Sequence, residues 1–481
     1  MQETTFTYHD LIQATSAKHQ GRLDASFFDS QLFTLALDSR EVKPTSVFLP
    51  LIGERFDAHT FLEGIVAHHP QTPQLAFCQR SYYQAHTDIL EALPSLGLLV
   101  VEATLDALQA LANFHRNRCH ALVVGLTGSS GKTTMKEYLR HCLGLYKNTQ
   151  ATLHNYNNDI GVAKTLLTIQ PEMQVVIVEM GMRGLGQIRR LTRMARPDIG
   201  LLINVGPAHI EMLGSLEAIA EAKCELVEGV QSDLVSNGDD ALLQARLNAL
   251  DIRHLSHHRY TQDTAQQLTP LANGCYTFEV DGVPFESKLP GLHQVSNLLG
   301  VLAVGRCIGI STEDIAKAFA SFVPQAGRFE AIELGGGHCL INDAYNANPA
   351  SMQASLTALF QSALLKQGMK RFLVLGSMQE LGEHSVSYHH ALLEQIKAFP
   401  AEEIEGVALI GNVFQSLPSD ALESTAFPIH YFEDVQAFEQ ILPTFVGRNP
   451  VQWFLKGSRS HALETCIPTL QHALAMKGHP Q

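Results

Sequence analysis

The residues with the clearest chemical pattern lie in one short stretch, GLTGSSGKTT at 125–134. An apolar run, ALVVGLT, precedes its glycines and a segment with helical spacing follows them, so the loop lies where a strand ends and a helix begins. Backbone amides and the positive end of a helix attract anions at such a junction, and Lys132 adds a charge. The stretch therefore predicts a phosphate-binding site. The alternative is a glycine turn that only joins strand to helix.

The loop is shorter than the common Walker pattern, because Leu126 stands where that pattern requires glycine. What remains reads T-G-x-x-G-K-T-[ST]. Gly128 and Gly131 still permit close approach of the backbone to an anion, and the hydroxyl of Thr133 is a suitable magnesium ligand. We therefore interpret the loop as a short nucleotide-binding form.

Composition limits the classes of protein and partner. The chain has 481 residues, of which 45% are hydrophobic, so it can bury several cores, and we expect two to four domains. With 34 basic and 48 acidic residues it lacks the positive field that holds nucleic acid. A nucleotide must therefore be bound by local donors such as those of the loop.

Neither the apolar runs nor the cysteines indicate an extracytoplasmic protein. The apolar runs are shorter than the roughly 20 residues of a membrane span, and MQETTFTYHD at the amino end lacks a basic-then-apolar signal. The eight cysteines are scattered without C-x-x-C or metal-like spacing, which is typical of reduced thiols, and we assign them no chemical role. We expect a cytoplasmic protein without membrane insertion.

Short apolar runs alternate with helical periodicity along most of the chain, which predicts α/β domains with mainly parallel sheets. Buried strands are expected at 120–127, 173–181 and 198–206, a hairpin turn at Asp281-Gly282, and helices at 293–309 and 311–322. We predict three domains. They are a small N-terminal α/β domain at 1–112, a central P-loop domain with a parallel sheet at 113–327, and a C-terminal Rossmann-like α/β domain at 328–481.

The short loop is the first of several motifs in which the chain resembles the Mur ligases and their folylpolyglutamate synthetase relatives. The other motifs follow in the family's order: TLHNYNNDIGVAKTLL, VIVEMG, GPAHIEMLGSLEAIAEAKCEL, LPGLHQVSNLLGVLAV, GRFE, NDAYNANPASM, LGSMQELGEHS and LKGSRSHALE. The resemblance covers nearly the whole chain from residue 38 onward. YNANPASM and MQELGEHS are most similar to the branch that joins D-alanyl-D-alanine to UDP-N-acetylmuramoyl-tripeptide.

The resemblance implies an ATP-dependent amide ligase that passes through an acyl phosphate. Because three anionic reactants must meet, cations and backbone donors are needed around the phosphates. The implied ATP ligands are Thr127, Gly128, Ser129, Ser130, Gly131, Lys132, Thr133, Thr134, Asn297, Arg328 and Asp343. The implied catalytic residues are Lys132, Lys223, His209, Asn157 and Asn158.

Magnesium is the second cofactor that the resemblance implies, with Thr133, Glu179, His209 and Lys223 around it. Lys223 would act as a carbamate formed with carbon dioxide, which turns a cation into an anion that orients the metal. Each residue type has a plainer alternative. Glu179 could be a solvated strand end, His209 a packing residue, and Lys223 an exposed partner of neighbouring glutamates. Asn157 and Asn158 could simply form a turn.

Substrate contacts are implied at both ends of the chain. Ser39, Arg40 and His59, in LDSREV and FDAHTF, would contact the uridine diphosphate. The incoming dipeptide would meet residues of the C-terminal half, namely Tyr345, Asn346, Asn348, Lys456 and Arg459. A turn before a helix and a solvated loop are the alternatives for these segments. We expect a monomer.

Four positions depart from the family's usual residues: His154, Gln294, Asn342 and Ser377. None of them removes a core catalytic group, although they bear on the fit of ATP and dipeptide. Two other functions stay open at this point. One is a folylpolyglutamate synthetase-like ligase, and the other is a non-catalytic nucleotide-binding protein that keeps the loop for stability.

Overall fold

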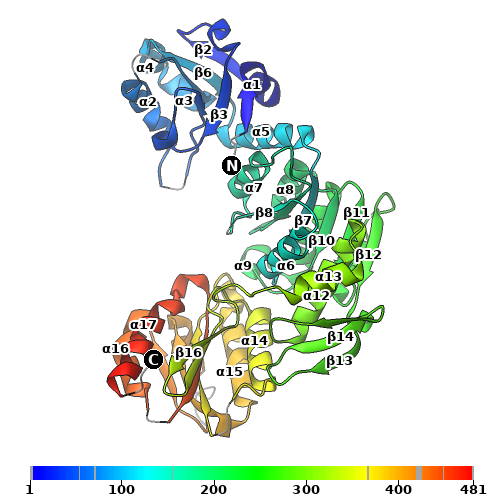
Figure 1. The fold of residues 1–481 in the computed structure, drawn as a ribbon. Coiled ribbons are helices and arrows are strands. Elements are labelled where there is room, and N and C mark those ends of the chain that lie inside the picture. Colours follow the sequence, from blue (N-terminus) through cyan, green and yellow to red (C-terminus); the bar gives the residue numbers. More distant parts are fainter. Residues whose placement is uncertain are drawn as a thin grey trace.

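The computed structural model describes residues 4–53, 55–69, 72–153, 155–365, 368–418, 425–447 and 449–478. These residues form three units arranged one after another, with the N-terminal unit at one end of the molecule (Figure 1). Within these ranges there are three six-stranded sheets, one in each unit, and a three-stranded sheet in the central unit. The predicted three-domain α/β class is confirmed. Across the same ranges, every helix is too short or too polar to span a bilayer.

The N-terminal unit has a mixed sheet in the order β1-β3-β4-β5-β6-β2. Its inner strands run parallel, whereas β1 and β2 at the two edges pair antiparallel. The strands are β1 (Thr5–Thr7), β2 (Lys18–Gly21), β3 (Leu32–Ala36), β4 (Ser46–Phe48), β5 (Gln74–Gln79) and β6 (Leu96–Val101). The helices are α1 (Tyr8–Thr15), α2 (Leu62–His68), α3 (Arg80–Ala85) and α4 (Thr87–Ala92).

Helix α5 (Thr104–Arg118) connects the first two units. It packs against α1 on one side and against α7 (Asp159–Leu167) and α8 (Gln187–Ala195) of the central unit on the other. Its buried Leu108 and Leu111 belong to a core that continues into both units. The predicted boundary at residue 112 falls within this helix.

The central unit has a fully parallel sheet in the order β12-β11-β10-β7-β9-β8. Its strands are β7 (Leu122–Thr127), β8 (Thr149–Ala151), β9 (Val175–Glu179), β10 (Ile199–Leu202), β11 (Asp233–Asn237) and β12 (Ser256–Tyr260). Besides α7 and α8, its helices are α6 (Lys132–Gly144), α9 (Ile210–Leu213), α10 (Leu216–Cys224), α11 (Ala241–Asn248), α12 (Leu292–Cys307) and α13 (Thr312–Ala320).

Both faces of this sheet are covered, which explains why its strands are continuous apolar runs rather than alternating ones. Val123 of β7 packs in the core shared with α7, α8 and α10, whereas Val124 and Leu126 pack with α6, α12 and α13. The strands expected at 120–127, 173–181 and 198–206 are present as β7, β9 and β10. β7 lies between β9 and β10, so the loop that follows it opens at the middle of the sheet's carboxyl edge.

The three-stranded antiparallel sheet contains β13 (Gln266–Pro270), β14 (Tyr276–Val280) and β15 (Val283–Glu286). Asp281 and Gly282 both have positive φ, 52° and 77°, between β14 and β15, as the expected two-residue hairpin turn requires. The helices expected at 293–309 and 311–322 are α12 and α13.

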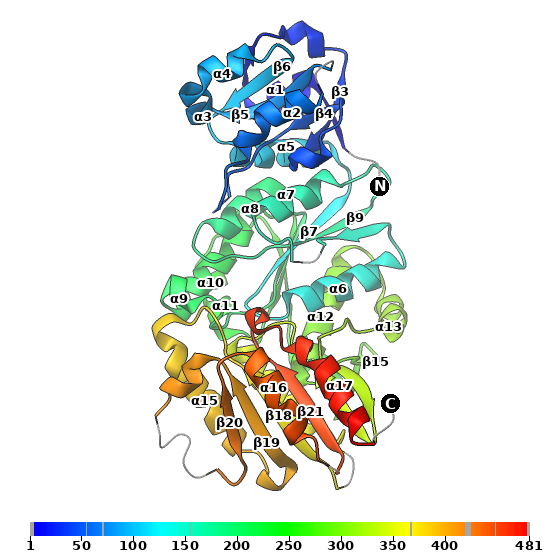
Figure 2. The same cartoon turned by 90° about the vertical axis from the view of Figure 1, so that its left-hand side faces the viewer.

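The C-terminal unit has the order β16-β17-β21-β18-β19-β20, parallel except for β16 at one edge. Its strands are β16 (Glu330–Gly335), β17 (His338–Asn342), β18 (Lys370–Gly376), β19 (Ile404–Ile410), β20 (Ile429–Phe432) and β21 (Val451–Lys456). Its helices are α14 (Pro349–Gln361), α15 (Ser385–Lys397), α16 (Val435–Phe445) and α17 (Cys466–Met476). This unit sits against the central unit, on the side away from the N-terminal one (Figure 2).

Candidate active site

The glycine loop follows β7 and ends at Gly131, which precedes the first turn of α6. Gly131 has φ 79°, in the left-handed region that favours glycine. A Cβ at this position would lie 3.4 Å from Oδ1 of Asn297 on α12. The loop is therefore packed against Asn297, one of the implied ATP ligands, and Gly131 serves both the turn and this close approach.

Asn204, just after β10, holds the loop in shape. Its Oδ1 accepts hydrogen bonds from the amides of Ser129 (3.0 Å) and Ser130 (2.9 Å), and its Nδ2 donates to the carbonyl of Ser130. The Ser129 hydroxyl donates to the carbonyl of Gly206 and accepts from its amide. Sequence analysis missed Asn204, because the strand was expected to run to residue 206 and β10 ends at Leu202.

Lys132 folds back over the loop, where its Nζ donates to the carbonyl of Gly128 at 2.7 Å. Burial lowers the pKa of Lys132, and the nearby carboxylate of Glu179 opposes this effect. The ammonium group is thus held beside the loop amides. Its Nζ also lies 3.4 Å from the carbonyl of Ser129, so a bound phosphate would compete with two carbonyls for its protons.

Glu179, the last residue of β9, lies buried at the same edge of the sheet. Its Oε1 accepts from Nδ2 of Asn157 at 2.9 Å and lies 3.5 Å from Oγ1 of Thr133. Its Oε2 is buried and, among the described residues, has no hydrogen-bond partner. A buried carboxylate oxygen without a partner is costly unless a cation satisfies it. The donor set of hydroxyl and carboxylate oxygens therefore fits magnesium.

Lys223 lies on α10 and is only 2% exposed. Burial lowers its pKa well below the ordinary lysine value, and repulsion from Lys132 acts in the same direction. Within the described part of the chain, no hydrogen bond or ion pair reaches its amine, although the nitrogen is not among the atoms that are fully shielded from solvent. The structure thus excludes the alternative of an exposed lysine paired with glutamates.

His209 precedes α9 with φ 64° and reaches across to the C-terminal unit. Its Nδ1 lies 2.5 Å from Oε2 of Glu380, whose own φ is 62°. This contact with His209 lowers the pKa of Glu380 despite partial burial. The carbonyl of Glu380 also accepts from the amide of Glu211, and its Oε1 lies 3.6 Å from Nε of Arg183, so Glu380 contacts three residues of the central unit. Sequence analysis did not anticipate a partner for His209.

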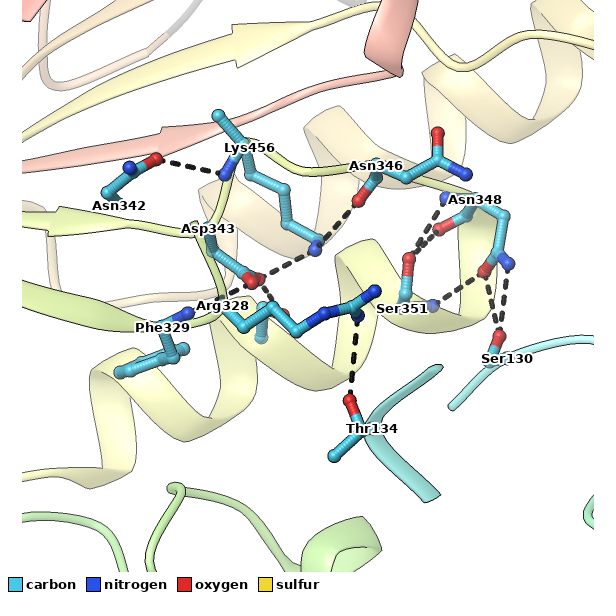
Figure 3. A network of polar contacts seen from close by, with 12 residues as sticks. Ser130, Thr134, Arg328, Phe329, Asn342, Asp343, Asn346, Asn348, Ser351 and Lys456 are labelled. Carbon is cyan, nitrogen blue, oxygen red and sulfur yellow. Dashed lines mark hydrogen bonds and ion pairs between the residues drawn. The ribbon is translucent and has the colours of Figure 1, made fainter. Parts of the chain in front are cut away.

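Residues of the C-terminal unit complete the site from the opposite side (Figure 3). Asp343, directly after β17, accepts from Nζ of Lys456 at 2.6 Å and from the hydroxyl of Ser355 at 2.6 Å. The guanidinium of Arg328 stacks over the ring of Tyr345, 4.2 Å from its centroid, and approaches Oγ1 of Thr134 in the loop helix. Arg328, Asp343, Lys456 and Tyr345 therefore lie on the side of the C-terminal unit that faces the loop helix α6.

Asn348 links this cluster directly to the loop, as Figure 3 shows. It caps α14, because its Oδ1 accepts from the amide of Ser351 at 2.9 Å. The same side chain exchanges hydrogen bonds with the hydroxyl of Ser130 at 3.0 and 3.1 Å. Asn346 accepts from the amide of Arg459, whose guanidinium points to Glu464 at the surface.

Other predicted residues have local roles in the structure. Asn158 caps α7 through the amide of Gly161, and Thr127 is buried at the end of β7. In the N-terminal unit, Ser39 and Arg40 lie in an exposed turn, where the Arg40 guanidinium lowers the pKa of Asp38 to about 2.

His59 is fully buried. Its Nδ1 contacts Asp57 at 2.5 Å, and its Nε2 accepts from the amide of Gln79 at 3.0 Å. Both ring nitrogens are thus engaged within the unit. Contact of Ser39, Arg40 and His59 with substrate stays a prediction.

The departures from the family pattern occupy three distinct settings. Gln294 accepts from the hydroxyl of Tyr138 and from Asn297, so it supports the residue behind the loop. Nδ2 of Asn342 donates a hydrogen bond to Oε2 of Glu330 at 3.3 Å. Ser377 bonds to Nε2 of His461 at 2.8 Å, in a cavity of about 430 Å³ that Glu211 of the central unit also lines. His154 lies outside the described residues.

Comparison with known proteins agrees with this geometry. The Mur ligase middle domain matches residues 126–305, and the Mur ligase, glutamate ligase domain matches residues 327–445. The UDP-N-acetylmuramoyl-tripeptide--D-alanyl-D-alanine ligase of Bacillus subtilis is 34% identical over 366 residues, which cover 74% of this chain and 75% of that protein.

Solved structures of similar proteins match the fold of this chain along nearly its whole length. A crystal structure of MurF from Acinetobacter baumannii superimposes with a TM-score of 0.84 at 27% identity, covering 98% of this chain and 100% of that one. MurF ligase from Thermotoga maritima in complex with ADP gives a TM-score of 0.75 at 27% identity, covering 92% and 98%. Together with the loop, the buried Glu179 and the cluster that faces them, these matches show that the chain belongs to the Mur ligase family.

Proposed function

We propose that this protein is the ligase that joins D-alanyl-D-alanine to UDP-N-acetylmuramoyl-tripeptide at the expense of ATP, in the synthesis of peptidoglycan precursors. The observation that carries this proposal is its likeness to ligases of that name, including the Escherichia coli enzyme at 31% identity over 94% of that protein's length. An ADP-bound relative of the same fold supports the nucleotide. The same likeness favours this activity over a folate ligase or a protein without catalysis.

The chemistry needs a phosphoryl transfer followed by an acyl transfer. A substrate carboxylate oxygen attacks the γ-phosphorus and ADP leaves. The dipeptide amine then attacks the acyl carbon, inorganic phosphate leaves, the nitrogen loses a proton to solvent, and an amide bond forms. Lys132 and the loop amides are placed to hold the phosphates, since Lys132 lies over the loop within 2.7 Å of a loop carbonyl. Arg328 and Lys456 supply further positive charge from the opposite unit.

Thr133 and Glu179 would hold magnesium, which supplies charge neutralisation at the phosphates when bound. His209 would contribute from the turn before α9. Lys223 has the properties needed to form a carbamate, because its side chain is buried and the pKa of its amine is well below the ordinary lysine value. Asn157 orients Glu179, whereas Asn158 fixes the start of the following helix.

We further propose a division of labour among the units. Residues 1–112 bind the uridine diphosphate through Ser39 and Arg40, with His59 supporting the turn. Residues 113–327 bind ATP. Residues 328–481 complete the nucleotide site and receive the dipeptide near Tyr345, Asn346, Asn348, Lys456 and Arg459. The protein acts as a monomer in the cytoplasm.

Phosphate release from ATP tests the proposal directly. Release should require UDP-N-acetylmuramoyl-tripeptide, and amide product should appear only when D-alanyl-D-alanine is added. In a competition assay the dipeptide should be used in preference to D-glutamate, L-alanine and meso-diaminopimelate. Preference for any single amino acid, or for a folate with glutamate, would reject the proposed substrates.

A further inference from the structure

Three side chains that could ligate a metal ion meet on the central unit, away from the nucleotide loop. Asp233 begins β11, His258 lies in the middle of β12, and Cys307 is the last residue of α12. Their ligand atoms all lie within 4.8 Å of one another. Among the described residues, this is the one group of three histidine, cysteine, aspartate or glutamate side chains that meets this limit.

The fold brings these residues together for a simple geometric reason. α12 packs across β11 and β12, and it begins beside the loop, where Asn297 faces Gly131. Cys307, at the other end of the helix, has its sulfur within 4.8 Å of the ligand atoms of Asp233, the first residue of β11, so the helix runs opposite to the strands and ends at the amino edge of the sheet. Val235 pairs with His258, so His258 lies on the face of the sheet that the helix covers.

We propose that Asp233, His258 and Cys307 bind a borderline divalent transition-metal ion of the zinc type. One oxygen, one nitrogen and one sulfur ligand, with a water in the fourth position, suit such an ion and do not suit magnesium or calcium. The helix end adds carbonyl dipoles that favour positive charge. On binding, the thiol proton leaves to solvent and the thiolate sulfur takes the metal.

Part of the site is already arranged. Nε2 of His258 lies 2.9 Å from Oδ1 of Asp233, while Oδ2 of Asp233 accepts from the hydroxyl of Ser232 at 2.7 Å. The serine therefore orients the carboxylate from behind, as partners of metal ligands commonly do. The His258 side chain is 45% exposed, which gives an ion access from solvent. Metal binding would replace one hydrogen bond and tie the end of α12 to two strands.

Cobalt(II) is a suitable probe, because a cobalt–thiolate bond adds a charge-transfer band that oxygen and nitrogen ligands do not give. The full-length protein is stripped with chelator and kept in excess magnesium, which occupies hard oxygen sites such as that at Glu179. Wild type is expected to develop the band and to lose it when zinc is added.

The variants separate this site from other thiols. Cys307→Ser should abolish the band, and His258→Ala should weaken binding at least tenfold, since loss of an outer-shell partner already costs about 10- to 100-fold. Cys119→Ser is the matched control. Cys119 is also partly exposed and lies 3.5 Å from a histidine nitrogen of His115, but it belongs to no group of three among the described residues.

A second readout is thermal stability, because a ligand that binds only the folded state raises Tm. Zinc should raise the Tm of wild type and Cys119→Ser, and should leave that of Cys307→Ser unchanged. Absence of the band in wild type would overturn the proposal. So would a band that survives Cys307→Ser, or one that is lost equally in Cys119→Ser.

Discussion

Lys223→Met is the substitution that best separates catalytic need from folding stability. The lysine is buried at 2% exposure and its amine has no partner among the described residues. Methionine keeps the apolar stem and removes the amine, and such volume-conserving changes disturb packing little. Burial disfavours the charged amine, as its lowered pKa shows, and incomplete solvation of a polar group costs about 1–3 kcal/mol. We therefore expect Lys223→Met to lose ligase activity while becoming more stable by about that amount.

Thermal unfolding measures this gain. For a domain of roughly 150–250 residues each kcal/mol shifts Tm by about 2–4 °C, so an increase of about 2–12 °C is expected. Lys317→Met on α13 is the control, because its side chain is 75% exposed and its replacement should change stability by less than about 0.5 kcal/mol. The buffers are kept free of bicarbonate, so that the amine is not modified.

The pH dependence provides the sharper check. The folded protein lowers the pKa of Lys223 below its ordinary value of 10.5, while the unfolded chain keeps that value. Between the two values the unfolded chain binds more protons, so wild-type stability rises with pH. The advantage of Lys223→Met should therefore shrink from neutral pH toward 10.5. A variant less stable than wild type, or an advantage that is constant with pH, would refute the reasoning.

Three further substitutions test other parts of the site. Lys132→Ala should lower the rate of ATP-dependent phosphate release roughly 100- to 1,000-fold with the fold intact by circular dichroism, and turnover within tenfold of wild type would contradict this expectation. Glu380→Ala should lower kcat/KM for ATP several-fold. The fall is limited because the pair of Glu380 with His209 is partly exposed and contributes about 1 kcal/mol or less. An unchanged kcat/KM would show that the pair has no role in the reaction. Gly131→Ala should lower the free energy of unfolding by about 1–2 kcal/mol, because φ is 79° and the new methyl group contacts Asn297. An unchanged Tm would show that the loop adapts to the methyl group.

The features that the sequence predicted are those whose residues are adjacent along the chain. The loop, its strand and its helix follow one another along the chain, so the order of residue types alone identifies Gly131, Lys132 and Thr133. The three-domain α/β class followed from apolar runs that alternate with helical periodicity. The predictions for Asp343 and Lys456 needed the resemblance as well, because neither residue type is distinctive alone.

Contacts between distant segments could not be read from the pattern. Asn204 holds the loop from another strand end, and Glu380 reaches His209 from another unit, so neither contact leaves a local signal. Adjacent residues also diverge. Asn157 and Asn158 have the same side chain, but one faces Glu179 and the other caps a helix, a difference that depends on backbone direction.

The cap of α14 has a consequence for how the two larger units respond to a nucleotide. Asn348, which precedes α14, lies against Ser130, two residues before the first residue of α6. Two positive helix ends therefore approach each other across the boundary, and they repel unless negative charge lies between them. An anion at the loop acts as a counterion that favours their approach. By thermodynamic reciprocity, whatever draws the two units together tightens the hold on that anion.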